Sequence, residues 1–251
     1  MPVCIYNNAG GKDKATLAAF REPSWNNPVV RAITADKKDI VPRLNGDYSR
    51  KGLVGYMISA LKKAGKPVPG YLSLLQKELS AVNTQQAVFG MYCFWTGEVR
   101  LGGLEGVLAT EPGFLDGHEV VSVTYDPTVL PYTKLVSIAQ QQKCATRVYT
   151  RSDDQQTTAK KFVGALAQRH DGDVRPDDQP KYQLSRSPLR YLPMTPMQQA
   201  RVNAAYGRRQ NFQAYLSPRQ LQLLSKIQGT PRHGWRSTIG LPIATAWATI
   251  K

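Results

Sequence analysis

The sequence has few cysteines and histidines. Its 251 residues include only three histidines and three cysteines, Cys4, Cys93 and Cys144. Three cysteines are too few, and odd in number, for the disulfide framework of a secreted domain. No spacing of cysteine and histidine matches a zinc site, so no metal site is predicted. These shortages favour a reducing, cytoplasmic setting.

Long apolar runs are also missing. No stretch is long enough to cross a bilayer, and the N-terminus lacks the basic and apolar regions of a signal peptide. We therefore expect no membrane insertion. With 41% hydrophobic residues in 251, the chain can bury an ordinary core, and its length predicts one or two domains.

Acidic residues are absent from the last part of the chain. Residues 181–251 contain 11 of the 33 lysines and arginines but none of the 18 aspartates and glutamates. The resulting positive field favours an anionic partner, such as a nucleic acid, an anionic lipid surface or an acidic protein. The simpler alternative is a solvated, partly helical extension that wraps around the core.

The stretch from Val88 to Pro127 contains the features that point to chemistry. Its first part, Val88–Phe94, is an unbroken apolar run that predicts a buried strand with Cys93 near its end. A helix is expected next, with Thr96 as its N-cap and Gly106 as its end. Cys93 would then lie beside a helix N-terminus, whose partial positive charge stabilises a thiolate. This position is typical of a reactive cysteine.

The elements around this stretch predict an α+β fold. Two strands are expected at Gly106–Thr110 and Glu119–Tyr125, separated by a turn-rich segment at Glu111–His118. Tyr132–Gln142 has apolar residues at helical spacing, and Ala145–Thr150 reads as a short strand. The order β-α-β-β-α-β is that of the ferredoxin-like fold, in which two helices cover one face of an antiparallel sheet.

Four segments are expected along the chain. They are an N-terminal α/β segment, a linker with a short helix, the central core, and a basic, mostly helical C-terminal extension, at residues 1–66, 67–85, 86–170 and 171–251. In the first segment, Val3–Tyr6 reads as a strand and Ser49 as the N-cap of an amphipathic helix. In the extension, Thr195 and Ser217 each precede a proline and predict helices that begin at Pro196 and Pro218.

Several short motifs of the central core occur in the same order in a known family. They are Tyr92-Cys93-Phe94-Trp95 followed by Glu98, then Gly113-Phe114, Gly117-His118-Glu119, and Val123-Thr124-Tyr125-Asp126-Pro127. Over residues 86–165 the chain resembles the A-type peptide methionine sulfoxide reductases, whose motif is Gly-Cys-Phe-Trp with a glutamate three positions later. Residues 1–66 faintly resemble the second half of a thioredoxin-like domain, without its Cys-x-x-Cys.

The resemblance implies a thiol-dependent reductase of methionine sulfoxide, free or in oxidised proteins. Cys93 would attack the sulfoxide sulfur while Glu119 donates a proton to the oxygen, which leaves methionine and a sulfenic acid on Cys93. Phe94 and Trp95 would form the apolar wall that receives the S-methyl group. Cys144 would condense with the sulfenic acid to a disulfide, which thioredoxin or another external thiol reduces. No cofactor or metal is implied.

The chain departs from the family within the implied substrate pocket. Phe114 stands where the family has a tyrosine whose hydroxyl holds the sulfoxide oxygen. The family's long loop before the glutamate is missing, and so is an Asp-x-x-x-Gln-Tyr-Arg-Ser segment, whose end is occupied by Gln142–Ala145. Losing one preorganised donor costs about 100- to 1000-fold in rate. A slow reductase, or one for a different sulfoxide, fits these departures.

The same residues allow interpretations without catalysis. Cys93 and its aromatic neighbours can be core packing, Glu119 can face solvent on an edge strand, and Cys144 can be a buried core residue. The alternative function is a redox-inactive binding module, including one for nucleic acid through the basic extension. RNA-recognition domains share the element order, but the third strand, Glu119–Val123, lacks their Gly-aromatic stacking motif.

Overall fold

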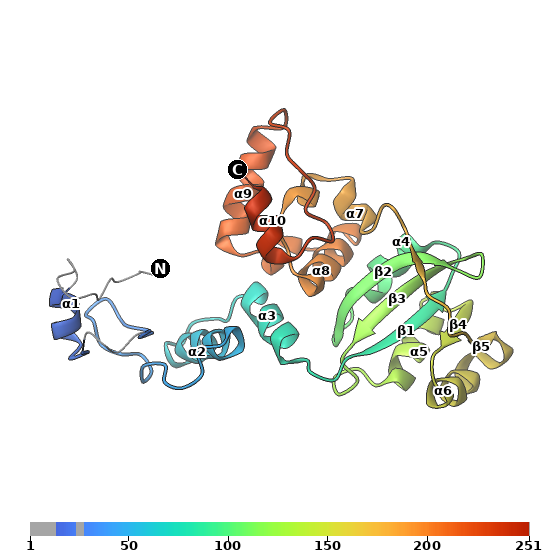
Figure 1. The fold of residues 1–251 in the computed structure, drawn as a ribbon, viewed down its shortest axis with the longest axis horizontal. Coiled ribbons are helices and arrows are strands. Elements are labelled where there is room, and N and C mark those ends of the chain that lie inside the picture. The colour runs from blue at the N-terminus through green and yellow to red at the C-terminus, as the bar shows by residue number, and fades with distance from the viewer. Residues whose placement is uncertain (1–13, 24–27, 251) are drawn as a thin grey trace. The chain divides into compact units, whose positions relative to one another are not determined.

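The computed structural model describes residues 14–23 and 28–250, and the strand expected at Val3–Tyr6, with Cys4, lies outside them (Figure 1). The chain divides into two compact units, Met1–Val68 and Pro69–Lys251. Over the described residues the fold is α+β, with a six-stranded mixed sheet and ten α-helices.

The first unit contains two helices in its described residues. Its helices are α1 (Lys14–Ala19) and α2 (Arg50–Lys63). Ser49 caps α2 as predicted, because its hydroxyl accepts a hydrogen bond from the Gly52 amide. Between residues 28 and 68 the expected α/β segment has two isolated bridges in place of strands, Val30 with Leu44 and Ile33 with Asp39. A two-stranded ribbon is only marginally stable by itself, which fits the short pairing.

The second unit is built on a sheet with the strand order β5-β4-β1-β3-β2-β6. Only β4 and β5 pair in parallel, and the other neighbours are antiparallel. The strands are β1 (Gln85–Gly90), β2 (Val107–Leu115), β3 (His118–Tyr125), β4 (Arg147–Thr150), β5 (Ala167–Arg169) and β6 (Arg175–Pro176).

Two helices cover one face of this sheet, α4 (Phe94–Leu101) and α5 (Tyr132–Gln141). The expected order of strand, helix, two strands, helix and strand is therefore present from β1 to β4. Phe89 on β1 packs with the helices in one cluster, whereas its neighbour Val88 packs on the opposite face with Tyr149. Burial on both faces explains why β1 reads as a continuous apolar run instead of an alternating one.

The junction between β1 and α4 differs in detail from the prediction. β1 ends at Gly90, and α4 begins at Phe94 with Cys93 as its N-cap residue, so Thr96 lies inside the helix. Between them the Met91 amide still bonds to the Glu119 carbonyl, but Tyr92 turns outward and is 96% exposed. Cys93 thus directly precedes the first helical residue.

The turn-rich segment expected at Glu111–His118 is instead the end of a hairpin. β2 continues to Leu115, β3 starts at His118, and only Asp116 and Gly117 turn. Both have positive φ angles, 50° and 73°, which fit the tight turns that match the twist of paired strands. The hairpin places Phe114 directly opposite Glu119.

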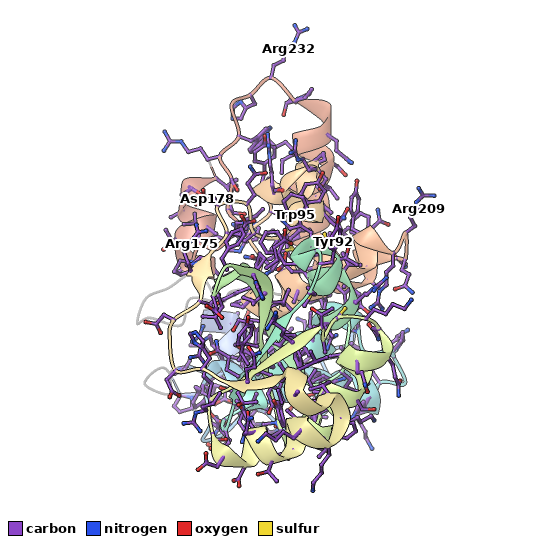
Figure 2. All side chains as sticks on the ribbon, turned by 90° about the vertical axis from the view of Figure 1, so that its right-hand side faces the viewer. Tyr92, Trp95, Arg175, Asp178, Arg209 and Arg232 are labelled. Atoms are coloured by element: carbon purple, nitrogen blue, oxygen red, sulfur yellow. The ribbon has the colours of Figure 1, made fainter. Side chains whose placement is uncertain are left out.

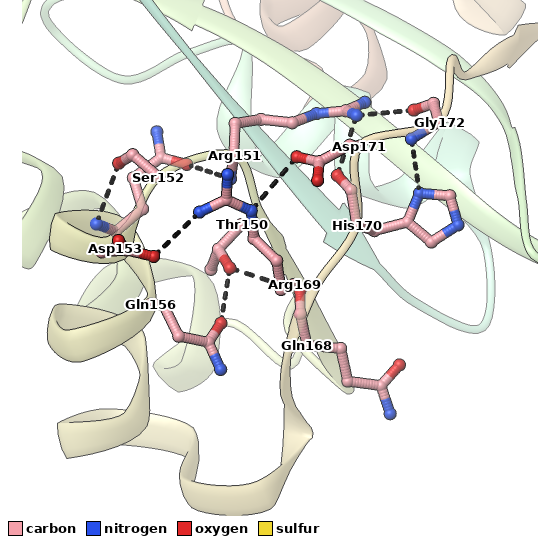
Figure 3. Close-up of polar contacts among 11 residues, drawn as sticks. Thr150, Arg151, Ser152, Asp153, Gln156, Gln168, Arg169, His170, Asp171 and Gly172 are labelled. Carbon is pink, nitrogen blue, oxygen red and sulfur yellow. Dashed lines mark hydrogen bonds and ion pairs between the residues drawn. The ribbon is translucent and has the colours of Figure 1, made fainter.

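The β4–α6–β5 edge of the sheet is held by polar contacts (Figure 3). α6 spans Asp153–Val163, and the Arg169 guanidinium on β5 contacts both Asp153 and Asp171 at 3.1 Å. Arg151 donates hydrogen bonds to the carbonyls of His170 and Gly172. These contacts hold the start of α6, which connects the parallel strands β4 and β5, against the end of β5.

Residues 182–249, from the start of α7 to the end of α10, form a helical layer in the same unit as the sheet. Thr195 and Ser217 cap their helices through side-chain hydrogen bonds, as predicted. α8 is covered on all sides because it packs on α3, α4 and β2. The helices of the expected extension lie beside β2 (Figure 1), so the extension is part of the core. The helices of this layer and α3 are α3 (Gly70–Ser80), α7 (Tyr182–Ser185), α8 (Pro196–Gly207), α9 (Pro218–Gly229) and α10 (Ile243–Thr249).

A buried ion pair joins α4 to the start of this helical layer. Glu98 is fully buried and Lys181 is 5% exposed, with 2.6 Å between the Lys181 Nζ and the Glu98 Oε1 atoms. The Lys181 amide donates to Glu98 Oε2 at 3.0 Å, and the Thr110 hydroxyl donates to Oε1 at 3.1 Å. Lys181 Nζ also donates to the Thr110 carbonyl. Both charges are therefore paired and hydrogen-bonded, as burial requires.

We expect Lys181→Met to lower the free energy of unfolding by about 3–5 kcal/mol, because it leaves the Glu98 carboxylate buried and unpaired. Replacing both partners, Glu98→Leu with Lys181→Met, should recover much of this loss. Urea unfolding curves measure both values. Lys77→Met, which removes an exposed pair with Glu105, is the control and should change little. Equal effects of Lys181→Met and Lys77→Met would contradict the structural role.

Candidate active site

Cys93 lies at the N-terminus of α4 and at the edge of a groove. Its side chain is half-buried and its thiol is free. The groove has a volume of about 500 Å³ and is lined by residues from α4, α7 and the end of α8, among them Cys93, Trp95, Arg100, Tyr182 and Arg208. This volume lies within the range of small-molecule sites.

Glu119 reaches the same end of α4 from the neighbouring strand. Its Oε2 atom accepts a hydrogen bond of 2.9 Å from the Phe94 amide, the first amide of the helix. The carboxylate is therefore bound to the residue that follows Cys93 and lies at the positive end of the helix dipole. Its second oxygen accepts no hydrogen bond from the described residues and is left for another partner. Glu119 does not line the groove itself.

The three aromatic residues expected in the substrate pocket cluster beside these groups. The Phe94 ring centroid is 5.5 Å from that of Trp95 and 5.4 Å from that of Phe114. The Trp95 indole stacks on Tyr182 at 4.2 Å, with 20° between the planes. Figure 2 shows Trp95 between the sheet and the C-terminal helices. Phe94 is buried, whereas Trp95 is partly exposed and lines the groove.

Cys144 is placed away from solvent, just before β4. Its side chain is 1% exposed, and its thiol donates a long, 3.5 Å hydrogen bond to the Gln142 carbonyl. Burial raises the pKa of the Cys144 thiol, although Arg100 and, more weakly, Arg208 act in the opposite direction. Cys144 therefore has less thiolate at neutral pH than an exposed cysteine.

Sequence reasoning missed three residues of the groove: Arg100, Tyr182 and Arg208. Tyr182 and Arg208 lie outside residues 86–165, which carry the family resemblance. Tyr182 follows Lys181 at the start of α7, and Arg208 follows the end of α8. Arg100 reads as an ordinary surface residue of an amphipathic helix. Only the missing acidic residues after position 180 hinted that a positive surface is formed there.

Neither a metal site nor a membrane span is found in the part of the chain that the structure describes. No three His, Cys, Asp or Glu side chains there come together in a way that would hold a metal ion. None of its helices is both long and apolar enough to cross a membrane.

Comparison with known proteins agrees with the motifs around Cys93. A peptide methionine sulfoxide reductase MsrA from Methanococcus maripaludis is 38% identical over 73 residues, which cover 22% of this chain and 46% of that protein. One from Salinispora arenicola is 31% identical over 116 residues, covering 34% and 53%. About a third of the chain is distantly similar to this family. The chain spans about half the length of these relatives.

Two further comparisons bear on the whole chain. No protein-family model matches it. Among solved structures, methionine sulfoxide reductase A of Corynebacterium diphtheriae aligns with a TM-score of 0.30 at 19% identity, over 43% of this chain and 74% of that one.

We expect iodoacetamide to label Cys93 in the native protein much faster than Cys144, because only Cys93 is accessible and the Cys144 thiol has a raised pKa. Peptide mass spectrometry after timed quenching measures both. Unfolding in urea should remove the difference, which serves as the control. Rapid native labelling of Cys144 would contradict its burial.

Proposed function

We propose that the chain is a thiol-dependent reductase of methionine sulfoxide. The observation that carries the proposal is the geometry at the start of α4, where a half-buried cysteine and a glutamate carboxylate converge on one helix end. The partial similarity to methionine sulfoxide reductases supports it. Cys93 directly precedes the helix, and the Phe94 amide at its start donates a hydrogen bond to Glu119, so both side chains lie at the positive end of the helix dipole.

In the proposed reaction the Cys93 thiolate attacks the sulfoxide sulfur, and the oxygen leaves that sulfur for Cys93. Protonated Glu119 supplies the proton that the oxygen requires. The products are methionine and a sulfenic acid on Cys93, so the sulfoxide gains the two electrons that the thiol loses. The second oxygen of Glu119, which has no partner among the described residues, is the one available to the substrate.

The aromatic cluster supplies the apolar part of the proposed site. Phe94, Trp95 and Phe114 would receive the S-methyl group and exclude water from the reacting sulfur. Because Phe114 has no hydroxyl, the oxygen would be stabilised by fewer donors than in the family. A chemical step slower than that of a complete pocket is therefore part of the proposal.

Regeneration is proposed to proceed through Cys144. Its thiol would attack the Cys93 sulfenic acid, releasing water and forming a disulfide that thioredoxin or a similar dithiol reduces. Because Cys144 is buried, this step would require local opening of the segment around Gln142. The hydrogen bond from the Cys144 thiol to the Gln142 carbonyl is long, so it holds this segment only weakly.

The wider setting stays part of the proposal. The sheet order β4-β1-β3-β2, with α4 and α5 on one face, supports a ferredoxin-like core. A scaffold role for the thioredoxin-like N-terminal segment, a cytoplasmic location and an anionic partner for residues 181–251 remain predictions. Lys181 and Arg201 contribute little to any such surface, because both are buried.

We expect the reduced protein to form one methionine per Cys93 from methionine S-sulfoxide, and Cys93→Ser to form none. Glu119→Gln should slow this single turnover by about 100- to 10,000-fold, because the amide keeps the bond to the Phe94 amide but has no acidic proton. Rapid quench and amino-acid analysis measure the rate. Glu111→Gln, at an exposed position of β2, is the matched control. Full activity of Glu119→Gln would refute the acid role.

Cys144→Ser should leave the first turnover intact and stop further turnover with thioredoxin as the only reductant. Methionine formed over many cycles, followed with NADPH consumption by the thioredoxin system, measures this. Steady multiple turnover in Cys144→Ser would show that thioredoxin reduces Cys93 directly.

A further inference from the structure

The groove beside Cys93 has two guanidinium groups with no acidic partner. Arg100, on α4, and Arg208, after α8, both line it. Across the described residues, neither is within salt-bridge distance of a carboxylate. Their charges therefore add in the groove instead of being neutralised by the protein.

Both guanidinium groups are held in place by neutral backbone acceptors. Arg208 Nη2 donates to the Arg100 carbonyl at 2.7 Å, and Arg100 Nη1 donates to the Gln142 carbonyl. Each guanidinium has five N–H donors in a rigid fork. The Arg100 side chain also hydrogen-bonds the buried Cys144 thiol. Arg208 therefore keeps most of its donors for a ligand, and Arg100 keeps fewer. An anchored guanidinium also loses less entropy when it binds.

The other side of the groove is aromatic. Trp95 and Tyr182 form a stacked pair that narrows the space next to Cys93, and the Gln183 amide lies beside them. Apolar side chains in the wall of a groove lower the local dielectric constant, which strengthens the attraction between a guanidinium group and a bound anion. The groove therefore combines a nucleophile, an apolar wall and paired cationic donors within a volume of about 500 Å³.

We propose that Arg100 and Arg208 bind a carboxylate of the ligand that reacts at Cys93. Planar guanidinium groups match carboxylates through paired, charge-assisted hydrogen bonds. This proposal rests on the proposed function for its substrate: the site prefers methionine sulfoxide with a carboxylate close to the sulfoxide. That carboxylate belongs either to a free amino acid or to an acidic peptide.

A purely structural role for the two arginines makes a different prediction. They would then only satisfy carbonyl groups at the end of α4 and after α5, which basic side chains commonly do. Such a role gives Cys93 no preference between charged and neutral reagents of the same shape. The distinction can thus be measured without any sulfoxide substrate.

The first test compares iodoacetate with iodoacetamide as alkylating reagents for Cys93. We expect Arg208→Gln to lower the ratio of the iodoacetate rate to the iodoacetamide rate by about tenfold, because a charge-assisted bond to the carboxylate is lost. Arg209→Gln is the matched control, since it makes the same charge change on a neighbouring residue that points away from the groove (Figure 2). Mass spectrometry of the Cys93 peptide gives the rates.

Two outcomes of this test overturn the proposal. One is an unchanged ratio in Arg208→Gln, and the other is an equal fall in Arg209→Gln, which would show only a general field. The wild-type ratio should also fall from 50 mM to 500 mM salt, a second measurement that does not depend on a variant being folded. A ratio that does not respond to salt counts against the site.

The second test uses sulfoxide substrates that differ in one carboxylate. Free methionine S-sulfoxide and its N-acetyl derivative should have a kcat/KM about tenfold above that of the N-acetyl amide, and Arg208→Gln should remove the difference. A peptide with glutamate beside the sulfoxide distinguishes the second source of the carboxylate. If alkylation shows the preference but no sulfoxide is reduced, the reductase proposal fails and the anion site stands. If all sulfoxides are reduced equally, the anion site fails and the reductase stands.

Discussion

The buried pair of Glu98 and Lys181 is the constraint on which the site depends. Glu98 projects from the middle of α4, and Lys181 is the residue immediately before α7. Their contact, shared with Thr110 of β2, fixes the helical layer against the sheet. Because a buried charge is costly when unpaired, these three segments have one favourable arrangement. Tyr182 follows Lys181 and for that reason stacks on Trp95.

The candidate site is formed where short segments converge on one helix end. β1 delivers Cys93 to the start of α4, and the tight hairpin of β2 and β3 brings Phe114 and Glu119 to the same place. Backbone hydrogen bonds between the strands set these positions, so the placement of Cys93 and Glu119 does not rely on a long loop. The helical layer then closes one side with Tyr182 and Arg208.

Local signals in the sequence predicted much of the fold but not its long-range contacts. The caps Ser49, Thr195 and Ser217 were found because an N-cap acts within three residues. The hairpin at Asp116-Gly117 was missed although that pair is itself a turn signal, since the glycines and the proline around it suggested a loop. The groove could not be predicted, because Tyr182 and Arg208 meet Cys93 only through packing over more than 80 residues of chain.

The stretch that is similar to methionine sulfoxide reductases does not form a self-contained domain in this chain, because its interior is completed by later residues. Glu98 belongs to the motif that carries the resemblance, yet its countercharge comes from Lys181, outside that stretch. α8 likewise covers α4 and β2, with the buried Arg201 donating to the Gly102 carbonyl. If the shared stretch were expressed alone, the surface of α4 and β2 that α8 covers would be exposed, and the Glu98 carboxylate would lose its partner Lys181. The stretch that carries the resemblance and the basic helices therefore belong to one compact unit.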